Sequence, residues 1–466
     1  MKFDLCIIGG GAGAFAAAIR ANESKAKTVM INTGLPIGGT CVNVGCVPSK
    51  NLIHAAEVLH LAHHNSIPGI DLEIKHFDFQ RVIENELALV EELREEKYSK
   101  VLNNLEHVTL IEGMAKFNGS NEIGVNGKRI VAEKFIIACG STATIPPIEG
   151  IHDVGFLTHV EALKITQQPK ELIVIGAGPL SLEFSQLYSR FGSKVTMLVR
   201  KSSVFTRAEK ELTDQLTKIL IEEGINIQTN TEVRKAFKAN GKKHLICIRN
   251  GKEKTISVDE ILLATGKTPN TQGIEVDKVG VEIDEKQAIV VNRFLQTSQP
   301  HIYAVGDVTN LPLRLESTAG HEGTLAAENA LKGSKKFIDY NTVPYTIFTD
   351  PQLASIGFTE EEQMKKTGVY ACKTVPFSEV PKAFILRRTE GLIKMVIDPN
   401  TKKILGVHIL SLNGGELIAE AMALIKANQT IDDVINALPI FPTMAEALKI
   451  VALAFYKDIS KLSCCI

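Results

Sequence analysis

The feature that most constrains the fold of this chain is a unit of strand, glycine-rich turn and helix that occurs twice. The first copy begins with an apolar run at 3–8 and ends with a second apolar run at 28–31. Its turn has the form G-x-G-x-x-A, formed by Gly9, Gly11 and Ala14. In a βαβ unit, such a turn holds backbone N–H groups at the start of the helix against a pyrophosphate. The first copy therefore predicts a dinucleotide site.

The second copy lies in the middle of the chain. A strand is expected at 171–175, a helix at 182–191 and the next strand at 194–199. The turn residues are Gly176, Gly178 and Ser181, with serine in place of the third small residue. One such turn alone is a weak signal, but two copies with both flanking elements predict two nucleotide sites.

Size and composition exclude several classes of function. The chain has 466 residues, 44% of them hydrophobic, which is enough for two to four domains. A formal net charge of -1 argues against nucleic acid or a membrane surface as the main partner. The sequence contains no apolar run of the roughly 18 residues that a membrane span needs, and no signal peptide is expected. We therefore expect a cytoplasmic protein whose eight cysteines serve catalysis or metal binding.

Cys41 and Cys46 lie in a glycine-flanked segment shortly after the first turn, in a pattern typical of a redox pair. On a regular helix, five residues rise roughly 7.5 Å. That exceeds the Cα separation of about 7 Å beyond which a disulfide cannot form. An irregular backbone around Gly45 is therefore needed to bring the two sulfur atoms together.

Further motifs accompany these features, namely Ala138-Cys139-Gly140, Ala264-Thr265-Gly266, Gly306-Asp307 and the run 113–117. With them, the whole chain resembles the flavoprotein pyridine nucleotide-disulfide oxidoreductases, which include glutathione reductase and lipoamide dehydrogenase. The resemblance implies an α/β fold with two Rossmann-like nucleotide-binding domains and a C-terminal α+β dimerisation domain. It also implies bound FAD, NADPH or NADH as hydride donor, and a homodimer with an active site shared between its subunits.

The resemblance gives the expected domain boundaries. Residues 1–150 and 268–342 are the two parts of an FAD-binding and central domain, and 151–267 are the NAD(P)H-binding domain. Residues 343–466 are the dimerisation domain, with expected strands at 393–397 and 404–410 and helices at 415–427 and 444–455. A charged stretch, roughly 77–105, is expected to be helical.

The same resemblance implies which residues bind the two cofactors. For FAD they are Gly9, Gly11, Ala14, Asn32, Gly39, Thr40, Lys50, Ala115, Gly140, Gly306 and Asp307. For NADPH they are Gly176, Gly178, Ser181, Arg200, Lys201 and Gly266.

Two of these positions carry particular information. Family members usually have a glutamate at the position of Asn32, where it accepts both ribose hydroxyls. Asparagine can accept through its oxygen and donate through its nitrogen, so we expect FAD binding to survive in a weaker form. Arg200 and Lys201 follow the strand at 194–199, where two cations favour the 2′-phosphate of NADPH over NADH. The alternative for this pair is a solvated basic turn.

The resemblance also assigns catalytic roles. Cys46 is expected against the flavin, and Cys41 is expected to be the outer, exchanging thiol. Lys50 and Glu183 match an ion pair beside the flavin and the nicotinamide; the alternative is an ordinary salt bridge between domains.

One catalytic residue of the disulfide reductases is missing. Their segment His-Pro-Thr supplies an acid–base histidine from the partner subunit, but this chain has Phe441-Pro442-Thr443, with Glu446 close behind. General acid–base catalysis is typically worth about 10²–10⁴-fold. The loss of the histidine therefore argues against a disulfide substrate.

The end of the chain indicates a different electron acceptor. Cys464 and Cys465 are adjacent, so they can offer two soft thiolates to a metal ion more readily than they can form a disulfide. The complete set of features resembles the mercuric reductases, here without their N-terminal metal-binding domain. This implies that Hg(II) passes from the tail cysteines of one subunit to Cys41 and Cys46 of the other, where it is reduced to Hg(0). All four thiols are then metal ligands.

Some departures and alternatives stay open at this level. Well-known mercuric reductases place tyrosines near the metal, at positions that we align with Phe441 and Phe156. The chain could instead be a thiol-disulfide reductase, or a flavoprotein that sequesters metal without turnover. His60, His63 and His64 have a spacing that zinc could use, but a solvated helix face is the favoured interpretation. The other cysteines, at 6, 139, 247 and 372, are expected in the core.

Overall fold

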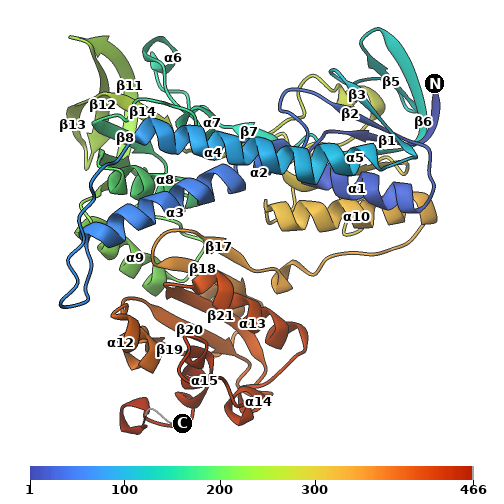
Figure 1. Ribbon diagram of the computed structural model, residues 1–466. Helices are drawn as coiled ribbons and strands as arrows, with labels where there is room; N and C mark the ends of the chain where they lie inside the picture. Colours follow the sequence, from blue (N-terminus) through green and yellow to red (C-terminus); the bar gives the residue numbers. More distant parts are fainter. Residues whose placement is uncertain (464–466) are drawn as a thin grey trace.

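The structure is a computed structural model that describes residues 1–463. Its N-terminal unit is built on a seven-stranded sheet (Figure 1). The strands are β1 (Lys2–Ile8), β2 (Thr28–Asn32), β3 (Val108–Glu112), β4 (Lys116–Gly119), β5 (Glu122–Val125), β6 (Lys128–Ile137) and β16 (Ile302–Ala304). The order is β3-β2-β1-β6-β5-β4, and the end of β6 also pairs in parallel with β16.

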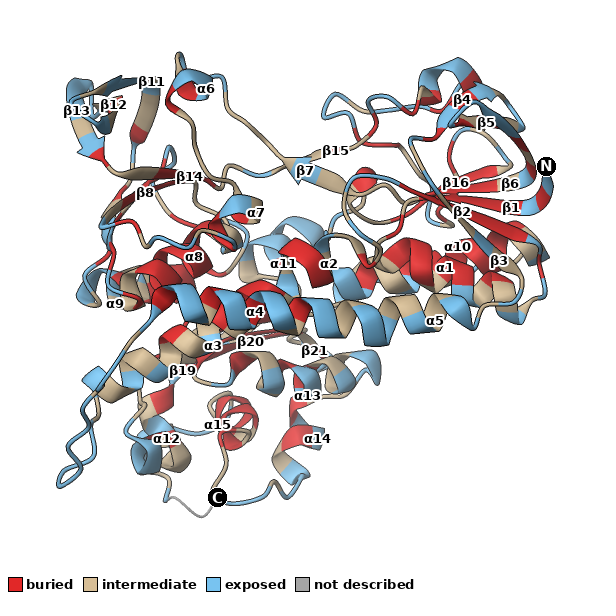
Figure 2. Ribbon diagram, turned by 45° about the horizontal axis from the view of Figure 1, so that its top comes forward, coloured by how far each residue is buried: buried red, intermediate tan, exposed pale blue. Residues whose placement is uncertain are grey.

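Two helices cover one face of this sheet side by side, α1 (Ala12–Glu23) and α10 (Glu316–Lys332) (Figures 1 and 2). They approach closely because of glycine: a Cβ on Gly323 would lie 2.1 Å from the carbonyl oxygen of Gly13. The turn between β1 and α1 has a similar requirement, since Gly9 has φ 131° and a Cβ there would lie 2.2 Å from the Ala138 oxygen. The predicted glycine turn therefore also fixes how the strand and helix pack.

The second unit contains a parallel sheet of order β10-β9-β8-β14 and an antiparallel sheet of order β11-β12-β13. The strands are β8 (Glu171–Ile175), β9 (Lys194–Leu198), β10 (Asn226–Gln228), β11 (Thr231–Ala239), β12 (Lys242–Arg249), β13 (Lys252–Val258) and β14 (Glu260–Leu263). Its helices are α6 (Ile151–Val154), α7 (His159–Ala162), α8 (Pro179–Arg190) and α9 (Lys210–Glu222). The short strands β7 (Ser141–Ala143) and β15 (Lys267–Pro269) pair to join it to the first unit.

The C-terminal unit has a five-stranded antiparallel sheet of order β17-β18-β21-β20-β19. Its strands are β17 (Tyr345–Ile347), β18 (Gln352–Gly357), β19 (Ala371–Pro376), β20 (Leu392–Ile397) and β21 (Ile404–Ser411). Its helices are α11 (Glu360–Thr367), α12 (Pro381–Leu386), α13 (Gly414–Lys426), α14 (Ile431–Asn436) and α15 (Glu446–Leu453). Helix α15 and the sheet enclose a separate buried core (Figure 2).

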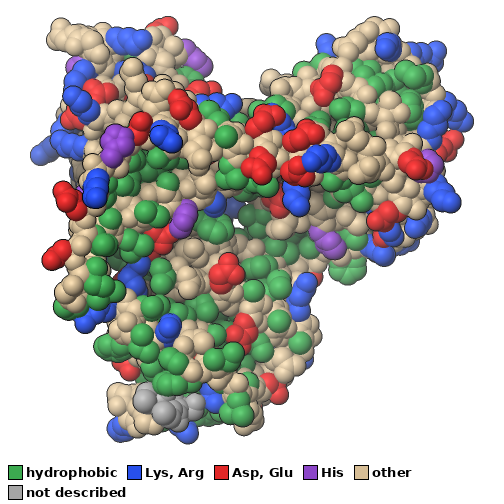
Figure 3. All heavy atoms as spheres, in the orientation of Figure 1, with side chains coloured by type: hydrophobic (Ala, Val, Ile, Leu, Met, Phe, Trp, Pro, Cys, Tyr) green, Lys and Arg blue, Asp and Glu red, His purple; other side chains and the backbone are tan. Residues whose placement is uncertain are grey.

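Long helices run between the units. The long ones are α3 (Cys46–His63) and α4 (Phe79–Arg94). The short α2 (Gly39–Val44) precedes α3, and a π-helical turn at Glu95–Ser99 joins α4 to the short α5 (Lys100–Asn103). The helical stretch expected at 77–105 is thus an α-helix interrupted by a π-turn. Figure 3 shows acidic and basic side chains mixed over the face in view, in agreement with the small net charge. Within residues 1–463, no helix is both long and apolar enough to cross a membrane.

The predicted fold class is confirmed: two nucleotide-binding α/β units and a C-terminal α+β unit. The boundaries expected at 150, 267 and 342 stay predictions. The return of β16 to the first sheet gives residues 268–342 a physical connection to that sheet.

Candidate active site

Cys41 and Cys46 lie on either side of a break between two helices. Helix α2 ends at Val44, and α3 begins at Cys46. Gly45 makes the break possible, because a Cβ there would lie 2.8 Å from the Thr40 carbonyl oxygen. The two cysteines are free thiols, and the Cys41 thiol donates a hydrogen bond to Cys46. The irregular backbone that the spacing required is therefore present.

This arrangement separates the two thiols chemically. The pKa of Cys46 is lowered to about 7, first by the hydrogen bond from Cys41 and then by the positive charge of Lys50. The pKa of Cys41 is raised, first because it is the donor in that hydrogen bond and then by burial. Cys46 is also the first residue of α3, where the helix N-terminus favours a thiolate. In the reduced pair, the negative charge is therefore more stable on Cys46, and Cys41 keeps its proton. The expected roles, with Cys46 against the flavin and Cys41 as the exchanging thiol, stay predictions.

Lys50 and Glu183 form an ion pair of 2.7 Å between α3 and α8. Glu183 is buried, and its second carboxylate oxygen accepts a 2.9 Å hydrogen bond from the backbone N–H of Phe348. The Lys50 ammonium lies 4.7 Å from the centre of the Phe348 ring. Residues from three units of the fold therefore hold this pair. Phe348 was not among the predicted site residues, because its contacts join segments 165 residues apart in the sequence.

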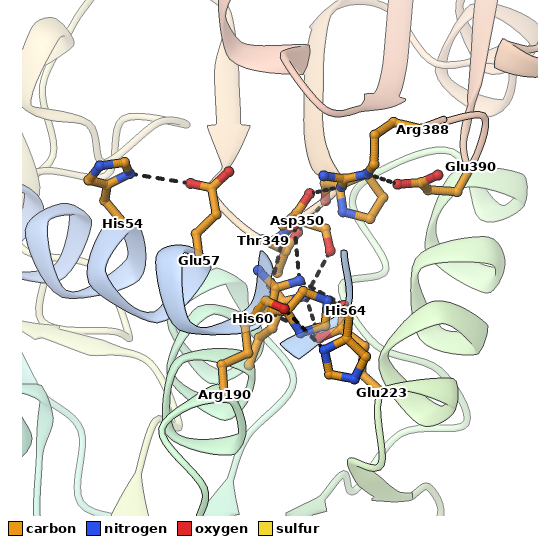
Figure 4. A network of polar contacts seen from close by, with 12 residues as sticks. His54, Glu57, His60, His64, Arg190, Glu223, Thr349, Asp350, Arg388 and Glu390 are labelled. Carbon is orange, nitrogen blue, oxygen red and sulfur yellow. Dashed lines mark hydrogen bonds and ion pairs between the residues drawn. The ribbon is translucent and has the colours of Figure 1, made fainter. Parts of the chain in front are cut away.

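A second polar network joins α8 to the C-terminal unit, and Figure 4 shows its members Arg190, Asp350 and Arg388. The side-chain amide of Gln186 donates to the backbone oxygen of Asp350 at 2.7 Å and accepts from its N–H at 2.8 Å. Arg190 pairs with the Asp350 carboxylate at 3.0 Å, and Arg388 binds its other oxygen. These cations lower the pKa of Asp350 against the opposing effect of burial. These contacts therefore fix the chain at Asp350, two residues after Phe348.

The predicted FAD-binding residues lie along the carboxyl edge of the first sheet, where ligands bind in this class of fold. Gly9 and Gly11 lie in the β1–α1 turn, Ala14 lies in the first turn of α1, and Asn32 ends β2. A Cβ on Gly39 would lie 2.6 Å from the Gly11 Cα, so the start of α2 and the turn form one backbone cradle. Among the other predicted residues, Thr40 is exposed beside Gly39, Ala115 is buried before β4, Gly140 follows β6, and Gly306 and Asp307 follow β16. Asp307 accepts a 2.6 Å hydrogen bond from Ser141. This glycine-lined cradle fits a dinucleotide pyrophosphate.

The second cradle repeats this construction. Gly176 has φ 146°, and a Cβ there would lie 2.2 Å from the Ala264 oxygen. Ser181 is fully buried and donates to that same oxygen at 3.1 Å, so it packs as a third small residue would. Gly178 caps α8, and Gly266 lies between β14 and β15. Arg200 and Lys201 are exposed just after β9, where Lys201 donates to the Thr206 hydroxyl at 3.2 Å.

One expected aromatic position was wrong. Phe156 packs against the core of the second unit, with its ring edge-on to His152 at 5.6 Å, rather than beside the thiols. Tyr98 does lie near them: its ring packs on Gly38 and edge-on to Phe15 at 4.9 Å. The pKa of Tyr98 is raised to about 12, mainly by burial and further by charge on Cys41, Glu316 and Cys46. Tyr98 lies in the π-turn between α4 and α5, which the helical pattern of the sequence did not reveal.

Phe441 lies in the C-terminal unit, half exposed at the edge of a cavity of about 390 Å³ that Phe384, Ile385, Leu462 and Ser463 also line. Glu446 is buried and accepts a 3.0 Å hydrogen bond from the N–H of Thr443. Its carboxylate therefore has a structural partner without a histidine at 441. Cys464 and Cys465 lie outside the described residues. Phe441 precedes α15 and Ser463 follows it, so both belong to the C-terminal unit.

Other candidates do not form a site. His60 stacks on His64 at 4.3 Å. Within residues 1–463, no group of three or more potential ligand side chains gathers to hold a metal ion. Cys6 and Cys247 are buried, and Cys139 and Cys372 are half-buried.

Comparisons with known proteins agree with this geometry. The pattern of the family "pyridine nucleotide-disulphide oxidoreductase" matches residues 3–330, and that of its dimerisation domain matches 343–452. A mercuric reductase of Lysinibacillus sphaericus is 39% identical and covers 100% of this chain and 84% of its own. One from Staphylococcus aureus is 38% identical, over 99% and 84% of the two chains.

Among solved structures, the HOCl-induced flavoprotein disulfide reductase RclA from Escherichia coli superimposes with a TM-score of 0.86 at 26% identity. The alignment covers 97% of this chain and 100% of RclA. The Cu(II) complex of RclA gives a TM-score of 0.87, also at 26% identity, over 98% and 100% of the two chains. The chain belongs to the pyridine nucleotide-disulphide oxidoreductase family.

Proposed function

We propose that this oxidoreductase reduces Hg(II) to Hg(0) with electrons from NADPH. The observation that carries the proposal is the pair of hydrogen-bonded thiols at Cys41 and Cys46, in a chain whose position 441 holds an apolar ring instead of an acid–base group. Two close thiolates suit a soft, thiophilic ion. The names of the relatives that are 38–39% identical support the same substrate.

The residues of the chain divide the work. Cys46 is ready to bind the metal as a thiolate near neutral pH, and Cys41 must release its proton as it becomes the second ligand. Because no leaving thiolate has to be protonated, the reaction does not need a histidine at 441. Lys50 helps to hold negative charge on Cys46, and the buried Glu183 holds Lys50 in place. Tyr98 lies close enough to the thiols that charge on them raises its pKa.

The two cradles provide the route for the electrons. FAD, when bound along the carboxyl edge of the first sheet, supplies two-electron transfer between the nicotinamide and the thiols. One hydride carries the two electrons that Hg(II) needs to become Hg(0). We assign NADPH to the second cradle because Arg200 and Lys201 are exposed cations just after the end of β9. The alternative, a solvated basic turn, predicts equal use of NADH.

The tail cysteines are proposed to act on the other subunit of a homodimer. In one subunit, the chain approaches its end in the C-terminal unit, on the far side of β17–β21 from α2, the helix that carries Cys41 (Figure 1). That unit also exposes large apolar side chains: Leu438 is 93% exposed, Ile440 79% and Phe384 63%. A patch of this kind marks an interaction surface, and the dimerisation domain of the family matches this region. We also propose a cytoplasmic location, where excess small thiols present Hg(II) as thiol complexes.

The test is NADPH oxidation by the FAD-loaded protein. Consumption that depends on Hg(II), in excess thiol, supports the proposal. Consumption with disulfides alone would instead identify a disulfide reductase, and tight metal binding without consumption would identify a sequestering flavoprotein. Replacing both Cys464 and Cys465 with Ala should lower Hg(II)-dependent turnover strongly but leave NADPH-dependent bleaching of the flavin unchanged.

Mixed dimers test the shared site. A subunit with Cys41→Ala and one with Cys464→Ala and Cys465→Ala are each expected to be inactive alone. One of the two sites of a mixed dimer is complete, so a mixed dimer should have about half of the wild-type activity. Random exchange of subunits makes about half of the dimers mixed, so about a quarter of the wild-type activity should return in the mixture. No recovery in a demonstrated mixed dimer would show that the tail serves its own subunit.

A further inference from the structure

Asn32 occupies the end of β2, where a nucleotide-binding fold of this kind normally presents a carboxylate to a ribose. It is 5% exposed, and both hydrogens of its amide are engaged. Its Nδ2 donates to the Leu35 carbonyl at 3.1 Å and to the Glu112 carboxylate at 3.3 Å. The amide oxygen faces the glycine turn, where a Cβ on Gly10 would lie 2.4 Å from it. Asn32 can therefore offer one acceptor, whereas a ribose diol has two hydroxyl donors.

Glu112 supplies the missing charge from the neighbouring strand. It is the last residue of β3 and the direct register partner of Asn32, so both side chains stand at the same carboxyl edge. Glu112 is exposed, and within residues 1–463 it forms no ion pair with a lysine or arginine. Its backbone is held in place, because its carbonyl accepts a 2.6 Å hydrogen bond from the Asn126 amide. One carboxylate oxygen contacts Asn32, which leaves the other available to a ligand.

We propose that Glu112 is the carboxylate that binds the adenosine ribose of FAD. Asn32 is a second acceptor for the ribose, and its amide also orients the Glu112 carboxylate. The acidic function has moved from the end of β2 to the end of β3, a separation of 80 residues in sequence. This inference rests on the proposal that FAD occupies the first cradle. It makes the asparagine at 32 one half of a two-residue ribose site instead of a weakened version of a single glutamate.

The experiment measures FAD affinity directly. The protein is stripped of flavin and titrated with FAD, and the loss of free-flavin fluorescence gives the Kd. Glu112→Ala should raise the Kd about tenfold, the effect of losing a charge-assisted hydrogen bond. Glu106→Ala is the matched control, since Glu106 is an exposed glutamate just before β3, and its Kd should equal that of the wild type.

A second variant separates ribose binding from a structural role. Adding Asn32→Glu to Glu112→Ala returns the carboxylate to the end of β2 and should restore the Kd to within about threefold of the wild-type value. Equal affinity of Glu112→Ala and wild type, or a double variant as weak as Glu112→Ala alone, would overturn the inference. Failure of the wild-type chain itself to take up FAD would overturn the proposed function and this inference together.

Discussion

At the scale of single residues, the chemistry of the site depends on the unequal pKa values of two neighbouring thiols. Cys46 is poised near neutrality by a hydrogen bond and a cation, whereas Cys41 keeps its proton. Such a pair attacks or binds through one defined sulfur. Two side chains lower the pKa of Cys46, Cys41 by its hydrogen bond and Lys50 by its charge. Replacing each in turn tests which of them has the larger effect.

We expect Cys41→Ala to raise the pKa of Cys46 more than Lys50→Met does, since the hydrogen bond is the larger cause. The thiolate fraction of Cys46 rises with pH through its pKa, so both variants should react more slowly near pH 7 and match the wild type at high pH. A shift of one unit from about 7 lowers the alkylation rate about fivefold at pH 7. The measurement is iodoacetamide labelling of Cys46 in the reduced protein between pH 5 and 9, followed by mass spectrometry. Lys97→Met, on the exposed face of the π-turn, is the control; if Lys50→Met behaves like it, Lys50 does not hold the thiolate.

At the scale of elements, the close approach of α1 and α10 sets the shape of the first cradle. Gly323 faces the Gly13 carbonyl, whereas a Cβ on Gly320, one turn earlier on α10, would have no neighbouring atom within 4 Å. Helix α10 therefore tolerates a methyl group at one glycine and not at the other.

Gly323→Ala should push α10 away from α1, lower the stability by about 1–3 kcal/mol and reduce the FAD content of the purified protein. Gly320→Ala should retain FAD and be equal or slightly more stable, because alanine favours a helix. Thermal unfolding and the ratio of flavin to protein absorbance provide the two measurements. Normal FAD content in a destabilised Gly323→Ala protein would separate helix packing from cofactor binding.

The elements that sequence predicts well are those whose requirements are local. Gly9 and Gly176 reveal the cradles because only glycine fits a turn so close to another backbone, and both turns occur as expected. Tyr98, Phe348 and Glu112 escaped prediction for the opposite reason. Each acquires its role from a contact with a segment far away in the sequence, and Tyr98 also lies in a π-turn that breaks the helical pattern. Phe156 was misplaced because alignment by residue type carries no information on which unit a loop packs against.

At the scale of the whole molecule, two buried ion networks join the second unit to the C-terminal unit. One centres on Asp350, bound by Arg190 and Arg388 (Figure 4). The other centres on Lys394, which is 2% exposed and pairs with Glu209 at 3.1 Å and Glu360 at 2.6 Å. Only the first network lies next to the active site, since Asp350 is two residues from the backbone N–H that binds Glu183.

The two networks therefore offer a matched pair of variants, Asp350→Asn and Lys394→Met. Asp350→Asn leaves Arg190 paired only with Glu223 and Arg388 paired only with Glu390, and Lys394→Met leaves the buried Glu209 without its lysine. Removing one partner of a buried ion pair costs up to about 3–5 kcal/mol, so both variants should lower the Tm. Only Asp350→Asn should also loosen Phe348 and, through it, the Lys50–Glu183 pair. We expect it to slow the bleaching of bound flavin by NADPH about tenfold, a typical result of small misplacement at a reacting centre. Anaerobic stopped-flow absorbance measures that rate without any metal present. Equal rates in the two variants would mean that the Asp350 network only joins the units, and that Lys50 and Glu183 keep their geometry without it.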